Sequence, residues 1–326
     1  MPTRDIVVVG ASAGGIPTLK ELVSLLPADF PAAMFIVLHV SRSAESLLPQ
    51  ILSRSAKLPV SFAEDEGEVR TGNIYVAPPD LHLLVENNRM RLVRGPRENR
   101  HRPAIDVLFR SAAWTFGPRV AGVVLTGFLD DGAAGLWAIK NCGGVTIVQD
   151  PADALHHDMP VNAARTIDVD YILPVAQIAP QLVRLASETV AVPQPNERPS
   201  SIKTEIGFAT MDRDITDMNT IGTLSAFTCP TCHGALWELH GDVLRYRCHT
   251  GHAFTRDSLI EEQTVEVEDA LYSAVRAVEE KATVLRRLGE RHSGRSESLK
   301  KDFEDKAAAL DQTANVLRAM LSGEAA

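Results

Sequence analysis

The sequence predicts an α/β fold with a mostly parallel, doubly wound sheet and an added antiparallel ribbon, followed by a small zinc-ribbon-like module and an α-helical hairpin. Three observations predict this arrangement. Apolar strand-like runs alternate with helical patterns through residue 188, which is typical of right-handed βαβ units. Three of the four cysteines then gather with metal-ligand spacing, and apolar residues recur at threes and fours in the tail.

The composition of the chain fits an enzyme with an appendage. With 326 residues, 45% of them hydrophobic, it can form one large core and a smaller region. The formal net charge of −9 argues against nucleic acid as a main partner. Because no apolar stretch has transmembrane length and the first residues lack a signal-peptide core, we expect a cytoplasmic protein without membrane insertion.

The first predicted strand runs directly into a serine framed by small residues. Residues 6–15 read Ile-Val-Val-Val-Gly-Ala-Ser-Ala-Gly-Gly, and a helix is expected from Ile16. Small residues let the backbone turn sharply here, so that the Ser12 hydroxyl is presented to solvent. Amides at the start of the helix would then suit a tetrahedral oxyanion. Ser12 is therefore a candidate nucleophile.

Two other interpretations of this turn remain open. A dinucleotide-binding turn is one, since Gly10 and Gly15 follow a strand. However, Ser12 stands where the middle glycine of that fingerprint lets backbone approach a pyrophosphate, and His39 stands near the place of the ribose-binding acid. An ordinary glycine-rich turn is the other interpretation. The residues that could act as base and acid for Ser12 have to decide between these interpretations.

Candidate partners follow two further apolar strands. His39 closes the run 34–38, and the run 120–127 leads into Asp130 and Asp131. Parallel strands place their carboxyl ends at one edge of the sheet, so a base and an acid can meet Ser12 there. The structural alternatives are a hydrogen-bonded core histidine and a helix N-cap aspartate.

Two more histidines could border the same edge. His156 and His157 follow the predicted strand 145–149 and serve as reserve candidates for the base or for substrate contacts. Between residues 60 and 92, turns at Thr71-Gly72 and Asn87-Asn88 predict the antiparallel ribbon.

Taken together, these residues resemble the chemotaxis protein-glutamate methylesterases of the CheB type over residues 4–188. The resemblance rests on Gly10-Ala-Ser-Ala-Gly-Gly15, on His39 after an apolar strand, on Arg102-Pro103 ahead of Asp106-Val-Leu-Phe109, on Thr126-Gly-Phe-Leu-Asp-Asp-Gly132 and on Met159-Pro160. It implies that Ser12 is the nucleophile, His39 its base and Asp131 the orienting acid. It also implies that the backbone amides of Ala13 and Phe128 bind the oxyanion.

The function implied by the resemblance is a serine hydrolase that demethylates protein γ-glutamyl methyl esters and releases methanol, with no cofactor for catalysis. Deamidation of protein glutamine is implied as a second activity, since both reactions share an acyl-enzyme. The expected partner is a methylated chemoreceptor or a similar signalling protein. The main alternative is a noncatalytic regulatory protein that acts through its C-terminal region; a nucleotide-dependent oxidoreductase is disfavoured by Ser12 and His39.

The sequence departs from the family pattern in three respects. Ala13 replaces a common threonine, and Phe128-Leu129 replaces a common Met-Gly pair, so the freedom of a glycine is lost beside the expected oxyanion site. Family members that act in chemotaxis usually carry an N-terminal receiver domain, whereas here a strand begins at Ile6. We therefore expect no control by phosphorylation within the chain.

We expect the catalytic domain to occupy residues 1–190 and a proline-containing linker to occupy residues 191–222. A zinc-ribbon module is predicted over 223–256, where Cys229, Cys232 and Cys248 supply thiolates to a structural zinc ion. His252 is favoured over His249 as the fourth ligand, because three intervening residues and Gly251 let the chain wrap back to the metal. A disulfide or a redox role for the clustered cysteines is weakly supported in a cytoplasmic protein. Cys142 is expected to be a packing residue.

The tail 257–322 predicts two amphipathic helices that form an antiparallel hairpin. Apolar positions recur at Val267, Leu271, Ala274, Val278, Leu285 and Leu288, and again at Leu299, Phe303, Leu310, Leu317 and Leu321. The segment His292-Ser-Gly-Arg295 interrupts the pattern. Such a hairpin either packs against the zinc module or supplies a surface for docking or self-association.

Overall fold

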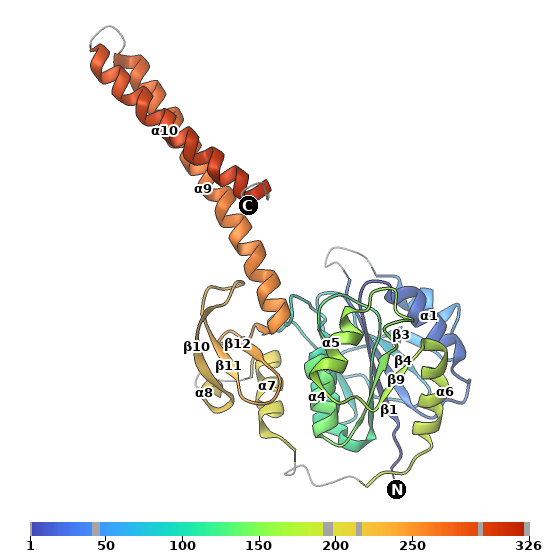
Figure 1. Ribbon diagram of the computed structural model, residues 1–326. Coiled ribbons are helices and arrows are strands. Elements are labelled where there is room, and N and C mark those ends of the chain that lie inside the picture. Colours follow the sequence, from blue (N-terminus) through green and yellow to red (C-terminus); the bar gives the residue numbers. More distant parts are fainter. Residues whose placement is uncertain (1, 41–45, 192–197, 213–216, 293–295, 323–326) are drawn as a thin grey trace. The chain divides into compact units, whose positions relative to one another are not determined.

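The computed structural model describes residues 2–40, 46–191, 198–212, 217–292 and 296–322 (Figure 1). The chain divides into two compact units, Met1–Leu259 and Ile260–Ala326. The first unit contains a seven-stranded sheet, a two-stranded ribbon and a four-stranded sheet, whereas the second is helical. Within the described ranges, no helix is both long and apolar enough to cross a lipid bilayer.

The large sheet is entirely parallel, with strand order β3-β4-β2-β1-β7-β8-β9. Its strands are β1 (Ile6–Ala11), β2 (Ala33–Leu38), β3 (Val60–Phe62), β4 (Ile74–Val76), β7 (Val120–Val124), β8 (Val145–Gln149) and β9 (Tyr171–Leu173). Every residue of β1, β2, β7 and β8 is buried. Continuous apolar runs are expected for strands that are covered on both faces.

Helices cover both faces of this sheet, which confirms the doubly wound α/β fold. One face packs against α1 (Gly15–Leu25), α2 (Leu48–Ser53) and α6 (Val175–Ala186). The other packs against α3 (Ile105–Phe116), α4 (Ala133–Asn141) and α5 (Asp158–Thr166), and a short 3₁₀ helix, Gly117–Arg119, leads into β7. Two apolar cores, one on each face, result from this layering.

The antiparallel ribbon is shorter than the sequence indicates. It consists of β5 (His82–Glu86) and β6 (Arg89–Val93), joined at Asn87-Asn88, where both residues have positive φ. The preceding strands β3 and β4 instead pair in parallel within the main sheet. The expectation of a ribbon beginning at residue 60 is therefore wrong, because two three-residue strands carry too little pattern to reveal their pairing partner.

The topology places the carboxyl ends of three strands side by side. β1 lies between β2 and β7, and the chain moves outward from β1 in opposite directions along the sheet. Such a point of reversal opens a crevice at the carboxyl edge, where open α/β sheets bind their ligands. Ser12 follows β1, His39 follows β2, and the loop 125–132 follows β7.

The segment 191–222, expected as a linker, contains two helices in its described part. α7 (Ser200–Thr210) begins after Pro199, and α8 (Met218–Ile221) leads into the next strand. Ile202 of α7 is fully buried in the core that also contains residues of α3 and β7. The segment is thus folded against the catalytic domain where it is described, whereas Pro193 and Pro195 lie outside the described residues.

The four-stranded antiparallel sheet forms the module that carries the cysteines. Its strands, in order across the sheet, are β10 (Gly222–Thr228), β11 (Ala235–Leu239), β12 (Arg245–Cys248) and β13 (Ala253–Thr255). The module has a small core of its own around Leu236, Tyr246 and Phe254. It belongs to the same compact unit as the parallel sheet.

The helical unit is an antiparallel pair, α9 (Arg256–His292) and α10 (Glu297–Ser322) (Figure 1). Arg286 pairs with Asp311 and Glu279 with Arg318, so positions earlier in α9 meet positions later in α10. The buried small residues Ala282, Ala307 and Ala314 let the helices approach closely. Residues 293–295 of the expected break lie outside the described ranges.

Candidate active site

Ser12 lies in a tight turn that is fixed by backbone hydrogen bonds. Its amide donates to the Thr126 carbonyl at 3.0 Å, and its own carbonyl accepts from the Gly15 amide at 2.9 Å. Gly14, the N-cap of α1, has φ 75°, a left-handed conformation that costs a glycine little. The helix therefore begins at Gly15, one residue before the predicted start, with half-buried Ser12 ahead of its first turn.

Gly127 allows the loop after β7 to approach Ser12. A Cβ at this position would lie 2.7 Å from the Ser12 Cβ and 2.1 Å from the Met159 sulfur. Backbone bonds hold the loop in place, since the Gly127 amide donates to the His156 carbonyl and its carbonyl accepts from the Met159 amide. The Thr-Gly and Met-Pro motifs named in the sequence are thus packed against the serine turn.

His39 and Asp131 form a buried hydrogen-bonded pair. The parallel register sets Ala11 opposite Leu38, so Ser12 and His39 follow paired positions on neighbouring strands. His39 Nε2 lies 2.8 Å from Asp131 Oδ2, and the two side chains are 5% and 2% exposed. His39 Nδ1 has no hydrogen-bond partner among the described residues, and no Ser12–His39 hydrogen bond is found among them. Catalytic hydrogen bonds often close only when substrate is bound.

Asp131 is held as a carboxylate by four hydrogen bonds. Oδ2 also accepts from the Ile105 amide at 2.8 Å, and Oδ1 accepts from the Asp106 amide at 3.2 Å and from Asn99 Nδ2 at 3.0 Å. Two of these donors are the first amides of α3, where a helix favours negative charge. Although burial opposes ionisation, His39 and these donors hold the pKa of Asp131 below its usual range.

A second carboxyl group lies next to Asp131. Asp106 Oδ1 accepts from the amides of Gly132 and Gly135, and its Oδ2 accepts from Asn99 Nδ2 at 2.8 Å. Burial, together with the charge of Asp131, raises the pKa of Asp106 to about 8. Of the two neighbours, Asp131 is therefore the one that keeps its negative charge beside His39.

The structure decides between the two aspartates that the residues alone left open. His39 bonds Asp131, whereas Asp130 accepts a hydrogen bond from the Thr255 hydroxyl at 2.5 Å, and burial raises the pKa of Asp130 to about 6. Asp131 does not cap the helix that follows it, since the N-cap of α4 is Gly132, without a side-chain cap. It instead binds the start of α3.

The reserve histidines border the crevice without reaching Asp131. The His156 ring lies 4.3 Å from the ring of Phe128, which is 52% exposed. His157 is the N-cap of α5, and its side chain is 64% exposed. Leu129, at the position of the lost glycine, has φ 60°, and its carbonyl accepts from Asn162 Nδ2. The backbone has kept the glycine-like conformation despite the change.

Sequence reasoning missed two neighbours of the site, Asn99 and His101. The His101 ring stacks on that of His39, with centroids 3.5 Å apart and planes 8° from parallel. Burial and the nearby His39 lower the pKa of His101 to about 3, so this ring is neutral at pH 7. Asn99 and Arg100 both have positive φ. Nothing in a loop rich in arginine shows that it bends back onto the catalytic edge.

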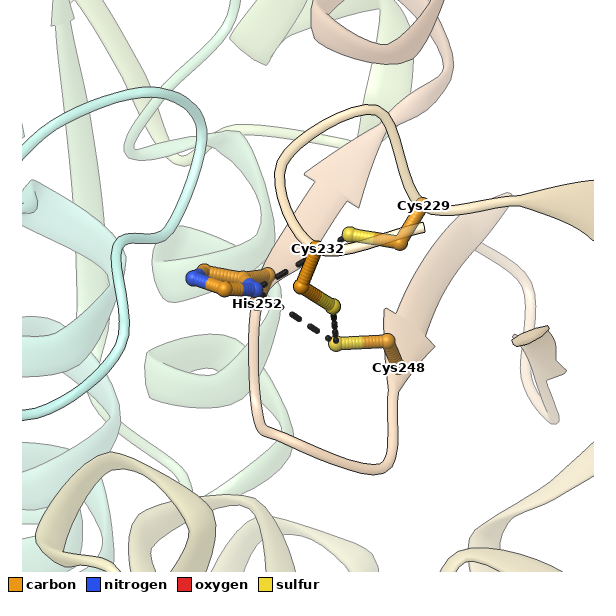
Figure 2. A group of neighbouring side chains, drawn as sticks. All are labelled: Cys229, Cys232, Cys248 and His252. Carbon is orange, nitrogen blue, oxygen red and sulfur yellow. Dashed lines mark hydrogen bonds between the residues drawn. The ribbon is translucent and has the colours of Figure 1, made fainter. Parts of the chain in front are cut away.

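The four expected metal ligands converge in the small module (Figure 2). The ligand atoms of Cys229, Cys232, Cys248 and His252 all lie within 4.8 Å of one another. The sulfurs of Cys232 and Cys248 are 3.7 Å apart, and Cys248 Sγ is 3.6 Å from His252 Nδ1. A tetrahedral zinc ion with Zn–S bonds of about 2.3 Å requires ligand separations of roughly this size. The donor set and its geometry therefore fit Zn²⁺.

The remaining candidates in the module and the last cysteine have other roles. His249 is exposed and lies against Gly234 rather than in the cluster, so His252 is the histidine that the fold brings to the sulfurs. All four cysteines are free thiols. Cys142 packs in the core beside α4, where burial raises the pKa of its thiol to about 11 and suppresses reactivity.

Comparison with known proteins identifies the family of the parallel-sheet domain. The family model for the CheB methylesterase matches residues 7–182, a little over half of the 326 residues. The chain belongs to the CheB methylesterase family. Among solved structures, it is similar to the CheB methylesterase catalytic domain of Thermotoga maritima, with 32% identity and a TM-score of 0.54, over 57% of this chain and 99% of that one.

Curated CheB relatives cover the same region. A Leptospira interrogans protein, named provisionally as a protein-glutamate methylesterase/protein-glutamine glutaminase, is 38% identical over 56% of this chain and 94% of its own length. An Anaeromyxobacter dehalogenans protein-glutamate methylesterase/protein-glutamine glutaminase is 41% identical over 56% of this chain and 51% of its own. These CheB matches extend over at most 57% of the present chain, so the cysteine module and the helical hairpin lie largely beyond them.

Proposed function

We propose that this chain is a serine hydrolase that demethylates γ-glutamyl methyl esters on a chemoreceptor-type signalling protein and releases methanol. The observation that carries the proposal is the buried His39–Asp131 hydrogen bond at the carboxyl edge of the sheet, one strand away from the Ser12 turn. Membership of the CheB methylesterase family and the names of the relatives support the substrate class.

In the proposed first half-reaction, His39 accepts the proton of Ser12 while Oγ attacks the ester carbonyl. Because Nε2 is engaged by Asp131, Nδ1 is the nitrogen that accepts this proton. Ionised Asp131 stabilises the imidazolium that results. The backbone amides of Ala13 and Phe128 bind the oxyanion, and methanol leaves with the proton from His39.

In the second half-reaction, water takes the place of the alcohol. His39 removes a proton from water, the resulting hydroxide attacks the acyl-enzyme carbonyl, and Ser12 leaves with the proton returned by His39. The products are a free glutamate side chain and regenerated enzyme. A glutamine side chain would form the same acyl-enzyme, with ammonia as the leaving group. The names of the relatives, which pair methylesterase with glutaminase, support this second activity.

The direct test compares wild type with Ser12→Ala in two assays. One measures labelling by a serine-directed fluorophosphonate, and the other measures methanol release from methylated receptor. Ser24→Ala is a matched control, because among the described residues the Ser24 hydroxyl bonds only the Glu21 carbonyl of its own helix. We expect both signals in wild type and control, and a loss of turnover on the order of 10⁴-fold or more in Ser12→Ala.

Other outcomes separate the parts of the proposal. Labelling at Ser12 without methanol release would keep the hydrolase and discard the receptor ester as substrate. Ammonia release from receptor glutamine that depends on Ser12 would establish the second activity. No labelling and no turnover in wild type would favour a noncatalytic regulatory protein.

We also propose a structural zinc ion at Cys229, Cys232, Cys248 and His252. The convergence of three sulfurs and a ring nitrogen supports it. Reduced thiols in this cluster and in the core are consistent with action in the cytoplasm. Metal analysis should find one zinc per chain in wild type and in Cys142→Ser, and much less in Cys232→Ser.

The helical hairpin is proposed as a surface for self-association. Exposed apolar side chains on its two helices support this, including Val284, Val316 and Met320, each more than half exposed. These positions are better probes than Leu310 and Leu317, which are half-buried within the hairpin. If Val284→Glu with Met320→Glu leaves the mass in solution unchanged, self-association through this face is ruled out.

A further inference from the structure

A loop of the catalytic domain takes its strand partner from the cysteine module. The Asn99 amide donates to the Ala253 carbonyl at 2.8 Å, and the Ala253 amide donates to the Arg97 carbonyl at 3.3 Å. Glu98 and Ala253 thereby form a parallel bridge. β13, the last strand of the module, therefore pairs with residues 97–99, and both segments lie in the same compact unit.

The loop that β13 holds also touches the proposed catalytic pair. Asn99 Nδ2 donates to Asp131 at 3.0 Å and to Asp106 at 2.8 Å. Two residues later, the His101 ring stacks on His39. The conformation of this single loop thus sets the position of the Asn99 amide on Asp131. It also sets the position of the His101 ring on His39.

The module fixes the other end of the Asn99 side chain. Asn99 Oδ1 accepts from the Thr255 amide at 3.0 Å and lies 3.3 Å from the Ser258 hydroxyl. The Thr255 hydroxyl donates to Asp130, next to the acid, and its oxygen lies 2.9 Å from the Ser258 hydroxyl. Asn99, Thr255 and Ser258 are all at least 96% buried. With its oxygen held by the module, the amide must turn its two N–H groups toward the carboxylates.

A buried ion network anchors the same contact. Arg247 of β12 is fully buried and reaches Glu98 at 2.9 Å and Glu205 of α7 at 3.1 Å. Arg110 of α3 also pairs with Glu98. Separating the module from the loop would break the ion pair between Arg247 and Glu98, whose side chains are both almost fully buried, and the loss of one partner from a buried ion pair is strongly unfavourable. The contact is therefore expected to persist in solution.

We infer that Thr255, the last residue of β13 in the cysteine module, and Ser258, in the first turn of α9 that follows it, are positioning residues for the catalytic acid, acting through Asn99 and Asp130. The module would then complete the active site rather than merely accompany it. This inference rests on the proposed function, because it assigns a role in the reaction that Ser12, His39 and Asp131 carry out. Among the described residues, the hydrogen bonds of Thr255 and Ser258 go to neither Ser12 nor His39, so each residue is proposed to act on the rate through the orientation of Asp131.

The test uses a pair of substitutions at one position. Thr255→Val keeps the volume and the backbone donor but removes the hydroxyl that bonds Asp130, whereas Thr255→Ser keeps the hydroxyl and removes a methyl group. Ser258→Ala removes a donor to Asn99. We expect Thr255→Val and Ser258→Ala each to lower kcat about fivefold to tenfold with KM unchanged, and Thr255→Ser to retain wild-type kcat. Thr264→Val is the control, since in the described part of the chain its exposed hydroxyl bonds only the Ile260 carbonyl within α9.

The outcomes distinguish this inference from the function beneath it. If wild type shows turnover that depends on Ser12 while Thr255→Val and Ser258→Ala stay within twofold of it, the inference fails and the proposed function stands. If Thr255→Ser loses as much kcat as Thr255→Val and both lower the melting temperature equally, the role is packing and the inference fails. If wild type shows no turnover that depends on Ser12, the proposed function fails first and the inference fails with it.

Discussion

At the scale of single residues, the proposed site depends on backbone conformations that side chains ordinarily avoid. Leu129 has φ 60° between Phe128 and the two aspartates, and Asn99 and Arg100 also have positive φ. Such conformations cost about 1–2 kcal/mol for a residue with a Cβ and persist where the surroundings impose them. In the loop that contains Asn99 and Arg100, they accompany the hydrogen bond from the Asn99 amide to Asp131 and the stacking of the His101 ring on His39.

Replacement of Leu129 by glycine should stabilise the fold. Relief of the left-handed conformation, about 1–2 kcal/mol, exceeds the entropy cost of glycine, about 0.5–1 kcal/mol, so the free energy of unfolding should rise by roughly 0.5–1 kcal/mol. Urea unfolding would measure this. Leu155→Gly is the control, since Leu155 is exposed and has no positive φ, and it should become less stable. A loss of stability in Leu129→Gly would show that its side chain contributes more than its backbone costs.

The neutral state of His101 should make stability depend on pH. The pKa of His101 falls from 6.5 to about 3 on folding. Below pH 6.5, His101 therefore binds a proton in the unfolded chain but stays neutral in the folded chain. Stability should therefore decline as the pH falls from 6.5 toward 3. Between pH 7 and pH 5, wild type should lose about 2 kcal/mol more than His101→Gln. Denaturant titrations at the two pH values measure the difference, and equal losses would contradict it.

At the scale of elements, α7 shows that a segment of linker-like composition can be part of a core. Its residues Ile202, Phe208 and Ala209 are buried, and its Glu205 accepts hydrogen bonds from Arg245 and Arg247. The helix therefore connects the apolar core of the catalytic domain with the ion network that reaches the cysteine module.

Truncation of Ile202 should reveal this packing. Removing a fully buried isoleucine side chain to alanine costs about 2–5 kcal/mol, so Ile202→Ala should lower the melting temperature of the catalytic domain markedly. Lys203→Ala, one position on and exposed, should change stability by less than about 0.5 kcal/mol. Thermal unfolding compares the two. Equal melting temperatures would mean that residues 200–210 behave as a linker after all.

At the scale of the whole molecule, one short strand connects the proposed zinc ligands with the loop beside the proposed triad. His252, a proposed zinc ligand, immediately precedes β13, and β13 holds the loop that carries Asn99 and His101. Glu98 and Arg247 are 149 positions apart in sequence and share a buried ion pair. The appended module and the catalytic domain therefore form one structural unit.

Removal of the metal should lower esterase activity. Without it, the knuckle Cys248–His252 loses its crosslink and β13 its fixed position, so we expect kcat to fall on the order of tenfold and to recover when Zn²⁺ is restored. Metal content and methanol release are followed together during chelation. Because the Cys142 thiol lies outside the cluster, the Cys142→Ser variant should respond to the chelator as wild type does. Full activity in protein that is shown to be free of metal would mean that the active site does not depend on the cysteine cluster.

Much of the catalytic edge could be predicted because its signals are local. A buried strand is a continuous apolar run, and a parallel sheet brings the ends of such strands together, so Ser12, His39 and the Asp130–Asp131 pair could be assigned to one edge. The cysteine spacing similarly indicated the metal ligands before any fold was considered. The short strands β3 and β4 and the helix α7 were missed, since their hydrophobic patterns are too brief or too weak to reveal what they pack against.

By itself, the sequence determined the alternation of strands and helices in the catalytic domain, the candidates for nucleophile, base and metal ligands, and the family that they resemble. Those properties depend on near neighbours in the chain. Only the tertiary structure decided that Asp131 rather than Asp130 bonds His39, that Asn99 and His101 join the site, and that Thr255 and Ser258 support it. The physical reason is that these contacts connect segments up to 159 positions apart, and their geometry is set by the packing of whole elements.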